Sequence, residues 1–206
     1  VTINFNDGES KKMSINQAFQ EVNISKGYGK PISISVDSKK KVYAQINWQG
    51  IPDMFTIKEV SEKLKIKRKW LDDNGNPIQI DALKKGDSFW IHYSVEKIKK
   101  TYQRLDELAL SQLLPSGWEI DNSRLSQSAL PDWTQKLTIG NEEYVDIRDD
   151  SISWFFDLKT NESSMDFIVR INVVTPGKYI LAPTIAEAMY DDTYKAILPA
   201  KKVVVD

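Results

Sequence analysis

The chain has 206 residues, with 28 Lys and Arg against 29 Asp and Glu, and no cysteine. This length is enough for one large domain or two small ones with a hydrophobic core. Because the charges nearly cancel, nothing points to nucleic acid or an anionic membrane as a partner. The missing cysteine excludes disulfides, thiolate zinc sites and cysteine nucleophiles, and leaves the cellular compartment open.

The chain shows no targeting or membrane segment. No apolar run approaches the roughly 20 residues that a membrane helix needs, and no signal peptide is recognisable. The first residue is Val1, within a strand-like run, where a natural start would carry Met. We therefore expect a fragment of a longer protein.

The first 50 residues alternate in places and contain one short helical candidate. Ser14–Glu21 is expected to form a turn of helix with Ser14 as its N-cap. Strands are expected at Val1–Phe5, Ile32–Val36 and Lys41–Trp48.

A domain boundary is expected near Gly50-Ile51-Pro52, which interrupts the pattern. About 50 residues are too few for a comfortable sandwich. We therefore expect residues 1–48 to be C-terminal strands of a preceding β-sandwich domain and residues 49–206 to form a second domain.

Strand periodicity dominates the rest. Lysines alternate with Leu64, Ile66, Arg68 and Trp70, which predicts a half-buried strand whose lysines face water. Asp72–Pro77, with Asn-Gly at its centre, predicts a turn. Arg104–Leu114 fits either a helix or a strand, since Pro115-Ser116-Gly117 would end both. Further strands are expected at Phe89–Val95, Thr134–Ile139, Ser151–Leu158, Phe167–Val174, Lys178–Leu181 and Lys202–Val205. Many short strands separated by turns predict an all-β, antiparallel β-sandwich.

Catalytic and metal chemistry find little support in the sequence. His92 is the only histidine and no Gly-x-Ser-x-Gly elbow occurs, so we expect a packing or surface role for it. Asp72, Asn74 and Asn76 fit the first ligand positions of a calcium loop, but Pro77 stands where that loop needs glycine. A β-turn is therefore preferred. No catalytic residue, metal ligand or cofactor is predicted.

Two further acidic groups, around residues 146–150 and 191–192, could supply carboxylates to a cation but are more typical of solvated loops. The tryptophans could stack on sugar rings if several were exposed, but are expected to fill the core. Those weighed are Trp48, Trp90, Trp118, Trp133 and Trp154.

From about residue 50 onward the order of motifs resembles the last domain of bacterial alpha-2-macroglobulins. The motifs that carry the resemblance are Gly50–Pro52, the basic strand and "D-x-x-G-x-P" turn at 64–77, "L-x-x-G-D" at 83–87, Leu113–Leu125, Tyr144–Asp150, Val174–Tyr179 and Ala186–Asp191. The resemblance implies a macroglobulin-like sandwich, with 1–48 left from the domain before it. It also implies that the segment before residue 115 is a strand.

The resemblance implies a non-catalytic part of a protease trap in the periplasm or cell envelope, with a lipoprotein parent as one option. In such a trap, a protease cuts a bait region and is then caged or linked through a thioester. That thioester needs Cys and Gln in another domain, because this chain has no cysteine. The implied partners are the other domains of the parent, especially the thioester-type domain, with proteases as targets of the whole protein.

Two of these motifs place acids and aromatics in loops, which is typical of interfaces. The residues expected to contact the thioester-type domain are Tyr144, Asp146, Arg148, Asp149, Asp150, Met189, Tyr190, Asp191 and Tyr194. The alternative is that they fix loops internally.

Two other classes of function remain open. A carbohydrate-binding or adhesin module predicts an exposed aromatic platform, because one sandwich fold carries many functions. A small β-sandwich enzyme predicts carboxylates that converge in a cleft.

Overall fold

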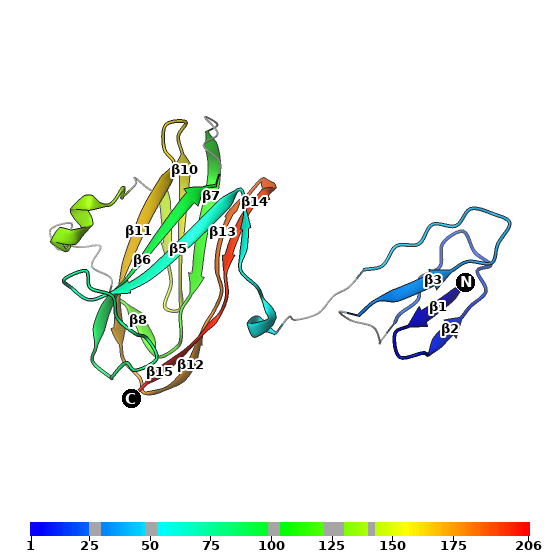
Figure 1. Ribbon diagram of the computed structural model, residues 1–206, viewed down its shortest axis with the longest axis horizontal. Helices are drawn as coiled ribbons and strands as arrows, with labels where there is room; N and C mark the ends of the chain where they lie inside the picture. Colours follow the sequence, from blue (N-terminus) through cyan, green and yellow to red (C-terminus); the bar gives the residue numbers. More distant parts are fainter. Residues whose placement is uncertain (25–29, 48–52, 99–103, 122–129, 140–142) are drawn as a thin grey trace. The chain divides into compact units, whose positions relative to one another are not determined.

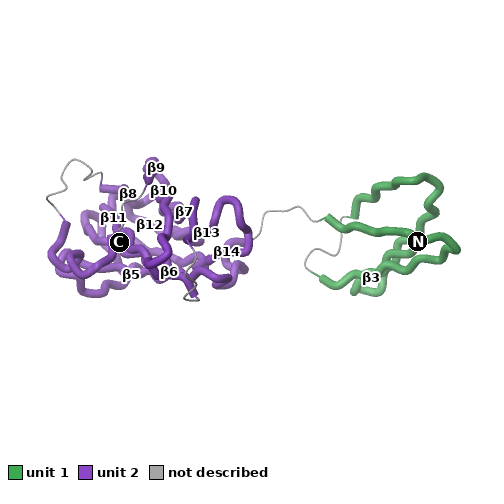
Figure 2. The backbone as a smooth tube through the Cα atoms, turned by 90° about the horizontal axis from the view of Figure 1, so that it is seen from above, with its two compact units in different colours: residues 1–51 green, residues 52–206 purple. Residues whose placement is uncertain are grey.

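The computed structural model describes residues 1–24, 30–47, 53–98, 104–121, 130–139 and 143–206. The chain divides into two compact units, Val1–Ile51 and Pro52–Asp206 (Figure 2). The boundary expected between residues 48 and 49 falls within 48–52, outside the described residues.

Unit 1 is a small antiparallel sheet in which β1 (Thr2–Phe5) lies between β2 (Ser10–Lys12) and β3 (Ile32–Ser35) (Figure 1). Among its described residues, Ile3 alone is a buried hydrophobic residue. The large hydrophobic residues that it exposes are Ile15, Phe19, Val36, Val42, Tyr43 and Ile46. A sheet with so much bare apolar surface has no core of its own.

Two expectations for unit 1 are wrong. Ser14–Glu21 is not helical, because an isolated helical turn of this length gains too little without a packed face. Lys41–Asn47 is not a strand, since a strand forms only where a neighbour completes its hydrogen bonds. Trp48 lies outside the described residues.

Unit 2 is a sandwich of two antiparallel sheets (Figure 1), as the alternation predicts, and the all-β fold class is confirmed. The larger sheet has the order β4 (Val60–Glu62), β14 (Asp191–Leu198), β13 (Thr184–Ala188), β7 (Leu105–Leu113), β10 (Ser151–Leu158) and β9 (Tyr144–Ile147). The smaller has the order β5 (Leu64–Leu71), β6 (Ser88–Lys97), β11 (Ser164–Val173) and β8 (Trp118–Ile120). The unit also contains an antiparallel pair of strands, β12 (Gly177–Leu181) and β15 (Lys201–Val205), and the short 3-10 helices η1 (Met54–Thr56) and η4 (Asp132–Lys136).

The core lies between the two sheets and is rich in aromatic rings. Alternate residues of β10 and β11 point inward, as their period of two requires. The ring of Trp154 on β10 lies 5.6 Å from Tyr93 on β6 and 5.5 Å from Phe167 on β11, and Phe156 lies 4.7 Å from Phe167. These contacts join the sheets, and the open question at Arg104–Leu114 resolves as strand β7.

The strand expected at Thr134–Ile139 is wrong, because the segment caps the outer face of β6 instead. Residues Asp132–Lys136 form the 3-10 helix η4, which places the Trp133 ring 6.3 Å from Trp90. Helix η4 acts as a lid that also covers His92. Nε2 of His92 lies 2.9 Å from Oδ1 of Asp166. The other oxygen, Oδ2, accepts a hydrogen bond from the Thr138 amide at 2.9 Å. The lone histidine therefore has a packing role, as expected.

Candidate interdomain surface

The nine residues expected to form an interdomain contact do not come together. β7 is antiparallel to both of its neighbours, and its last residue, Leu113, pairs with Ser151, whereas Leu108 near its start pairs with Ala188. The turn before β10 and the hairpin after β13 therefore lie at opposite ends of the six-stranded sheet (Figure 1). Tyr144 and Asp146 lie between these ends, on the edge strand β9.

The β13–β14 hairpin presents the most exposed aromatic residue of unit 2 in the described chain. Tyr190 is 86% exposed and its neighbour Met189 is 43% exposed. Asp191 fixes the turn, since its Oδ1 accepts hydrogen bonds from the Thr193 hydroxyl at 2.6 Å and amide at 3.0 Å. These hydrogen bonds lower the pKa of Asp191, so the carboxylate stays ionised at neutral pH.

Two backbone positions beside this hairpin are strained. Among the described residues, Lys63 (φ 57°) and Glu107 (φ 56°) are the only non-glycine residues with positive φ. The Lys63 ammonium donates to Oγ1 of Thr193 at 2.6 Å and lies 4.6 Å from the centre of the Tyr194 ring. The Glu107 carbonyl accepts from the Met189 amide at 2.9 Å. Strain of this kind clusters at functional sites, where surrounding contacts hold it in place.

An ionised aspartate holds the strained conformation of Glu107. The Glu107 amide donates to Oδ1 of Asp157 at 3.0 Å, and Nη2 of Arg104 donates to Oδ2 at 2.6 Å. Burial opposes ionisation of Asp157, but the hydrogen bonds from Glu107 and Arg104 outweigh it and lower its pKa. The register of β7 and β10 shifts at this point, between Phe156 and Leu158, which is a bulge.

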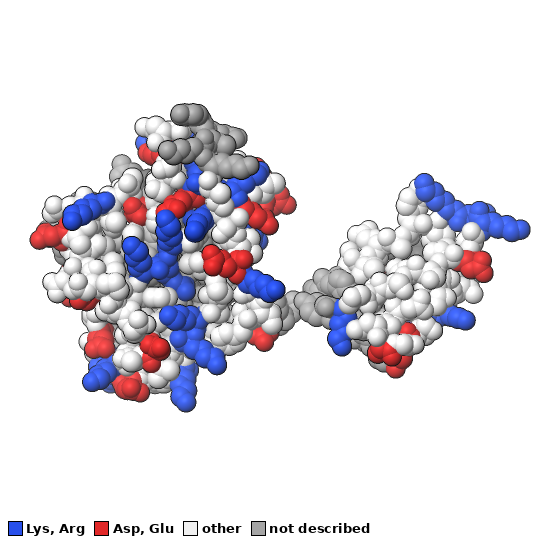
Figure 3. Space-filling view, viewed as in Figure 1, with Lys and Arg blue, Asp and Glu red and all other residues white. Residues whose placement is uncertain are grey.

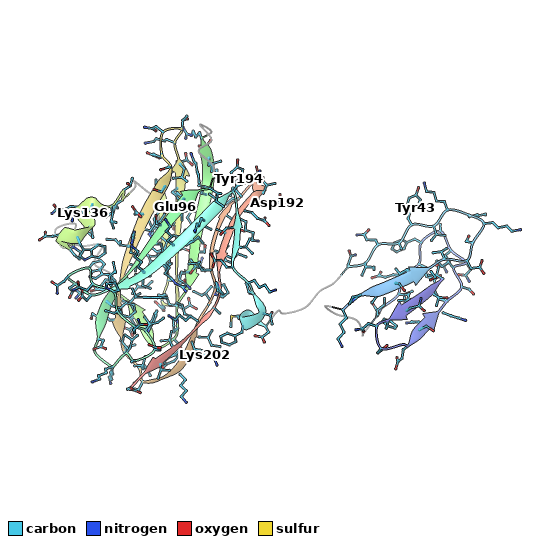
Figure 4. The ribbon with its side chains drawn as sticks, viewed as in Figure 1. Tyr43, Glu96, Lys136, Asp192, Tyr194 and Lys202 are labelled. Atoms are coloured by element: carbon cyan, nitrogen blue, oxygen red, sulfur yellow. The ribbon has the colours of Figure 1, made fainter. Side chains whose placement is uncertain are left out.

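Tyr194 plays a different part from Tyr190. It is half-buried and packs against the core, and Figure 4 shows it near Asp192 at the hairpin end of β14. Of the four hairpin residues expected to make contact, Met189 and Tyr190 therefore present free side chains, while Asp191 and Tyr194 support them.

The second group forms the turn between β9 and β10. Arg148 donates from Nε to Asp146 at 2.9 Å, and its amide bonds the Ser151 carbonyl at 2.9 Å. The Asp150 carbonyl accepts from the Leu114 amide at 2.7 Å, and the side chains of Asp149 and Asp150 are exposed.

Between the two ends, the outer face of the sheet carries the ion pair of Lys195 and Glu187, at 3.7 Å, beside neutral residues. Tyr144, 61% exposed, lies 5.9 Å from the ring of Phe155. The Ser111 and Ser153 hydroxyls lie 2.9 Å apart. Other half-buried residues of this face include Ala109, Ile185 and Ile197. The sequence reasoning missed the two isoleucines, although their alternation with buried Ala186 and Ala196 could have placed them on the outer face.

The calcium interpretation of Asp72 gives way to the turn. Oδ1 of Asp72 accepts from the amides of Asn74 at 2.9 Å and Asn76 at 2.8 Å. The side-chain hydrogen bond from Asn76, followed by the backbone ones, lowers the pKa of Asp72. Throughout the described ranges, no group of three or more His, Cys, Asp or Glu is placed to hold a metal ion. Within the same residues, no helix has the length and hydropathy to cross a bilayer.

The tryptophans among the described residues do not form a platform for sugars, and Trp48 lies outside those residues. Trp90, Trp118 and Trp154 are buried, and Trp70 and Trp133 are half-buried. Trp118 and Trp154 belong to the main core, which confirms the packing role expected for them.

The sandwich and its motif order define a macroglobulin-like domain of the bacterial kind. The model of the "Bacterial Alpha-2-macroglobulin MG10 domain" family matches residues 64–192. The chain belongs to this family.

Curated relatives include an alpha-2-macroglobulin of Xylella fastidiosa (strain 9a5c), 29% identical over 160 residues, which cover 72% of this chain and 9% of that protein. An alpha-2-macroglobulin homolog of Yersinia pestis is 24% identical over 191 residues, or 85% of this chain and 9% of that protein. The chain thus spans about 9% of the length of these relatives.

Solved structures show the same fold. Salmonella alpha-2-macroglobulin reacted with methylamine matches 72% of this chain and 10% of its own, with a TM-score of 0.60 and 23% identity. The native conformation of E. coli alpha-2-macroglobulin matches 77% of this chain and 10% of its own, with a TM-score of 0.60 and 21% identity.

Proposed function

We propose that this chain is the C-terminal part of a bacterial alpha-2-macroglobulin that traps proteases, and that its own role is non-catalytic. The family match supports this, together with the small share of each relative that the chain covers. The E. coli relative has been solved after activation by trypsin and by porcine elastase, which supports proteases as the targets of the parent. The parent would act in the periplasm or cell envelope.

In this proposal the β13–β14 hairpin packs on the thioester-type domain and shields it until the bait is cut. The observation that carries it is the exposure of Tyr190 on this hairpin. The residues beside the hairpin on its two sides, Lys63 and Glu107, have a strained backbone conformation. An exposed tyrosine on a rigid support is a favourable interface anchor, because it buries a large area and loses little entropy. The turn at 148–150 would contact a different surface, because it lies at the other end of the sheet.

Unit 1 would be the end of the domain that precedes this one in the parent. Its exposed apolar side chains, including Phe19 and Tyr43, support this, because they need covering by residues outside the unit.

Hydrogen exchange tests the hairpin contact. The amides of residues 186–194 are compared in the full-length parent, before and after protease cleavage, and in the isolated chain. We expect slow exchange in the intact parent and faster exchange after cleavage, when the contact opens. Equal exchange in the intact parent and the isolated chain would rule the contact out.

A matched pair of variants separates contact from stability. Tyr190→Ala in the parent should speed exchange of the thioester-type domain before cleavage and leave the melting temperature of the isolated chain unchanged. Phe55→Ala, an exposed aromatic on η1, is the control and should do neither. A lower melting temperature for Tyr190→Ala, with normal exchange in the parent, would make Tyr190 a loop-fixing residue instead.

A further inference from the structure

One cavity of unit 2 gathers cations and no anion. It has a volume of about 370 Å³ and lies between β5 and the connection from β14 to β15. Its lining includes Lys67, Arg68, Trp70, Pro199 and Lys201. Figure 3 shows Lys and Arg side chains gathered along the face that carries β5.

Arg68 is the unusual member of this lining. Its Nη1 donates to Oγ1 of Thr184 at 2.8 Å and to Oε1 of Gln112 at 3.3 Å, both neutral groups. No described carboxylate pairs with it, and its Nε is buried without a partner. Burial lowers the pKa of the guanidinium, and the group that opposes this is Tyr93, whose own pKa burial raises, so that its hydroxyl stays neutral at neutral pH. An enclosed cation without an anion is unfavourable unless a counter-ion arrives from outside.

Trp70 adds a second donor and a platform. Its ring lies 4.8 Å from the Arg68 guanidinium and 4.4 Å from the Lys201 ammonium. The indole Nε1 is buried and lacks an acceptor. Among the five buried side-chain donors without a described partner, two belong to residues that line this cavity, namely Arg68 Nε and Trp70 Nε1, and both atoms are covered by neighbouring side chains. Lys67 is already paired with Glu96 at 2.5 Å, whereas Lys201 has no described carboxylate partner.

We propose that this cavity binds a carboxylate, held by the free edge of the Arg68 guanidinium and by Lys201 beside the Trp70 ring. Nε of Arg68 is covered and has no partner, and Nη2 makes no hydrogen bond to a described residue, so a carboxylate that displaced the side chains covering this edge would match it with two parallel hydrogen bonds. A carboxylate only accepts, so it also suits the free indole N–H. The proposal goes beyond the protease-trap role and does not depend on it. The carboxylate comes either from a free organic acid or from an Asp or Glu side chain of another polypeptide segment.

Thermal melting of the full chain tests the site, with sodium acetate compared against sodium chloride at equal ionic strength. At about 100 times its Kd, acetate should raise the melting temperature of unit 2 by roughly 5 °C or more. Arg68→Met should abolish this rise, and Lys201→Gln should weaken acetate binding about tenfold. Lys69→Gln, an exposed lysine of the same strand outside the lining, should bind as the unchanged chain does.

A second readout covers the case in which Arg68→Met fails to fold. In the unchanged chain, the Nε–Hε NMR signal of Arg68 should shift on addition of acetate and stay in place with chloride. Equal effects of acetate and chloride in both measurements would overturn the proposal, with water filling the cavity. Binding of inorganic phosphate but not acetate would overturn the carboxylate assignment.

Two probes distinguish the sources. A blocked peptide with a single Asp is titrated against its Asn counterpart, and citrate serves as the small acid. If the Asp peptide binds at least about tenfold more tightly than acetate and the Asn peptide does not bind, the site takes a polypeptide side chain. If citrate binds more tightly than the Asp peptide, the site takes a free acid.

Discussion

The ring of Tyr179 lies against the backbone of Gly117, so that a Cβ at residue 117 would come within 2.5 Å of Cε2 of Tyr179. The Tyr179 hydroxyl donates to the carbonyl of Thr175 at 3.0 Å, and the Gly117 carbonyl accepts from the Val174 amide at 2.9 Å. The Pro-Ser-Gly turn before β8 and the Thr-Pro-Gly turn before β12 are therefore locked together, although about 60 residues separate them in the chain.

Gly117→Ala should destabilise unit 2 by about 1–3 kcal/mol, because the new methyl group overpacks a closed contact. Urea unfolding measures the loss. Tyr179→Ala in the same chain should relieve only part of it, since the Thr175 carbonyl would still stand 2.9 Å from the added Cβ. Ser116→Ala, at the exposed neighbour, is the control and should change little. A wild-type midpoint for Gly117→Ala would show that the turn moves freely.

Asp166→Asn should lower the free energy of unfolding by about 1–3 kcal/mol at pH 7, because the buried carboxylate accepts hydrogen bonds from both His92 and Thr138. Burial opposes ionisation of Asp166, but the hydrogen bonds from His92 and Thr138 lower its pKa below the ordinary 3.8. A lowered pKa gives stability that is present above the unfolded value and lost as pH falls through the folded value.

The difference in melting temperature between this variant and the unchanged chain should therefore persist above about pH 4 and shrink below it. Asp81→Asn, at an exposed position, is the control. A difference that stays constant down to pH 2 would mean that the charge of Asp166 plays no part.

Phe167→Ala should destabilise unit 2 by about 3–5 kcal/mol, because the ring fills the space between Trp154 and Phe156. The next residue, Ile168, points to the outer face and is only half-buried. Its change to Ala should cost clearly less, and chemical denaturation of both variants gives the comparison. Equal costs would contradict the assignment of the inner face.

Glu107→Gly should stabilise unit 2 by about 0.5–1 kcal/mol, because glycine adopts positive φ without strain. The matched change, Asp106→Gly, lies one residue earlier in the same strand and should destabilise. Melting of the two variants should move in opposite directions. If both fall equally, the Glu107 side chain itself stabilises the bulge.

The 51 residues of unit 1 should be largely unfolded as a separate peptide, because Ile3 alone forms the buried hydrophobic part of the described unit. Circular dichroism and the dispersion of amide NMR signals test this. A dispersed spectrum with a cooperative melt would show that unit 1 folds alone, and would count against its assignment to a preceding domain.

The sequence predicts the sandwich well where alternation is strong. Ser151–Leu158 matches β10 at both ends, because every second residue is buried. The strand prediction fails where apolar residues cover a sheet from outside. Thr134–Ile139 has a β-rich composition, but it belongs to the lid over Trp90 and His92 and is not a strand. Single-sequence patterns do not tell the outside of a covered sheet from its inside.

The candidate surface was less predictable than the fold. The motifs identify the segments that carry Tyr144 and Tyr190, although Tyr144 lies on strand β9 and not in a loop, and they do not show that antiparallel pairing sends 148–150 and 189–190 to opposite ends of the sheet. The strain at Lys63 and Glu107 has no sequence signal, since neither residue type favours positive φ. The missing counter-ion of Arg68 is likewise visible only in three dimensions.

The pairing of β4 with β14 brings Glu62 opposite Lys195. The first strand of unit 2 therefore cannot pair until one of its last strands has been synthesised. β7, near the middle of the chain, likewise gains its neighbour β13 only after some 70 further residues have been made. Such non-local pairings slow folding to milliseconds or seconds. We therefore expect this domain to fold only after its synthesis is complete, and to be most exposed to proteolysis and aggregation before then.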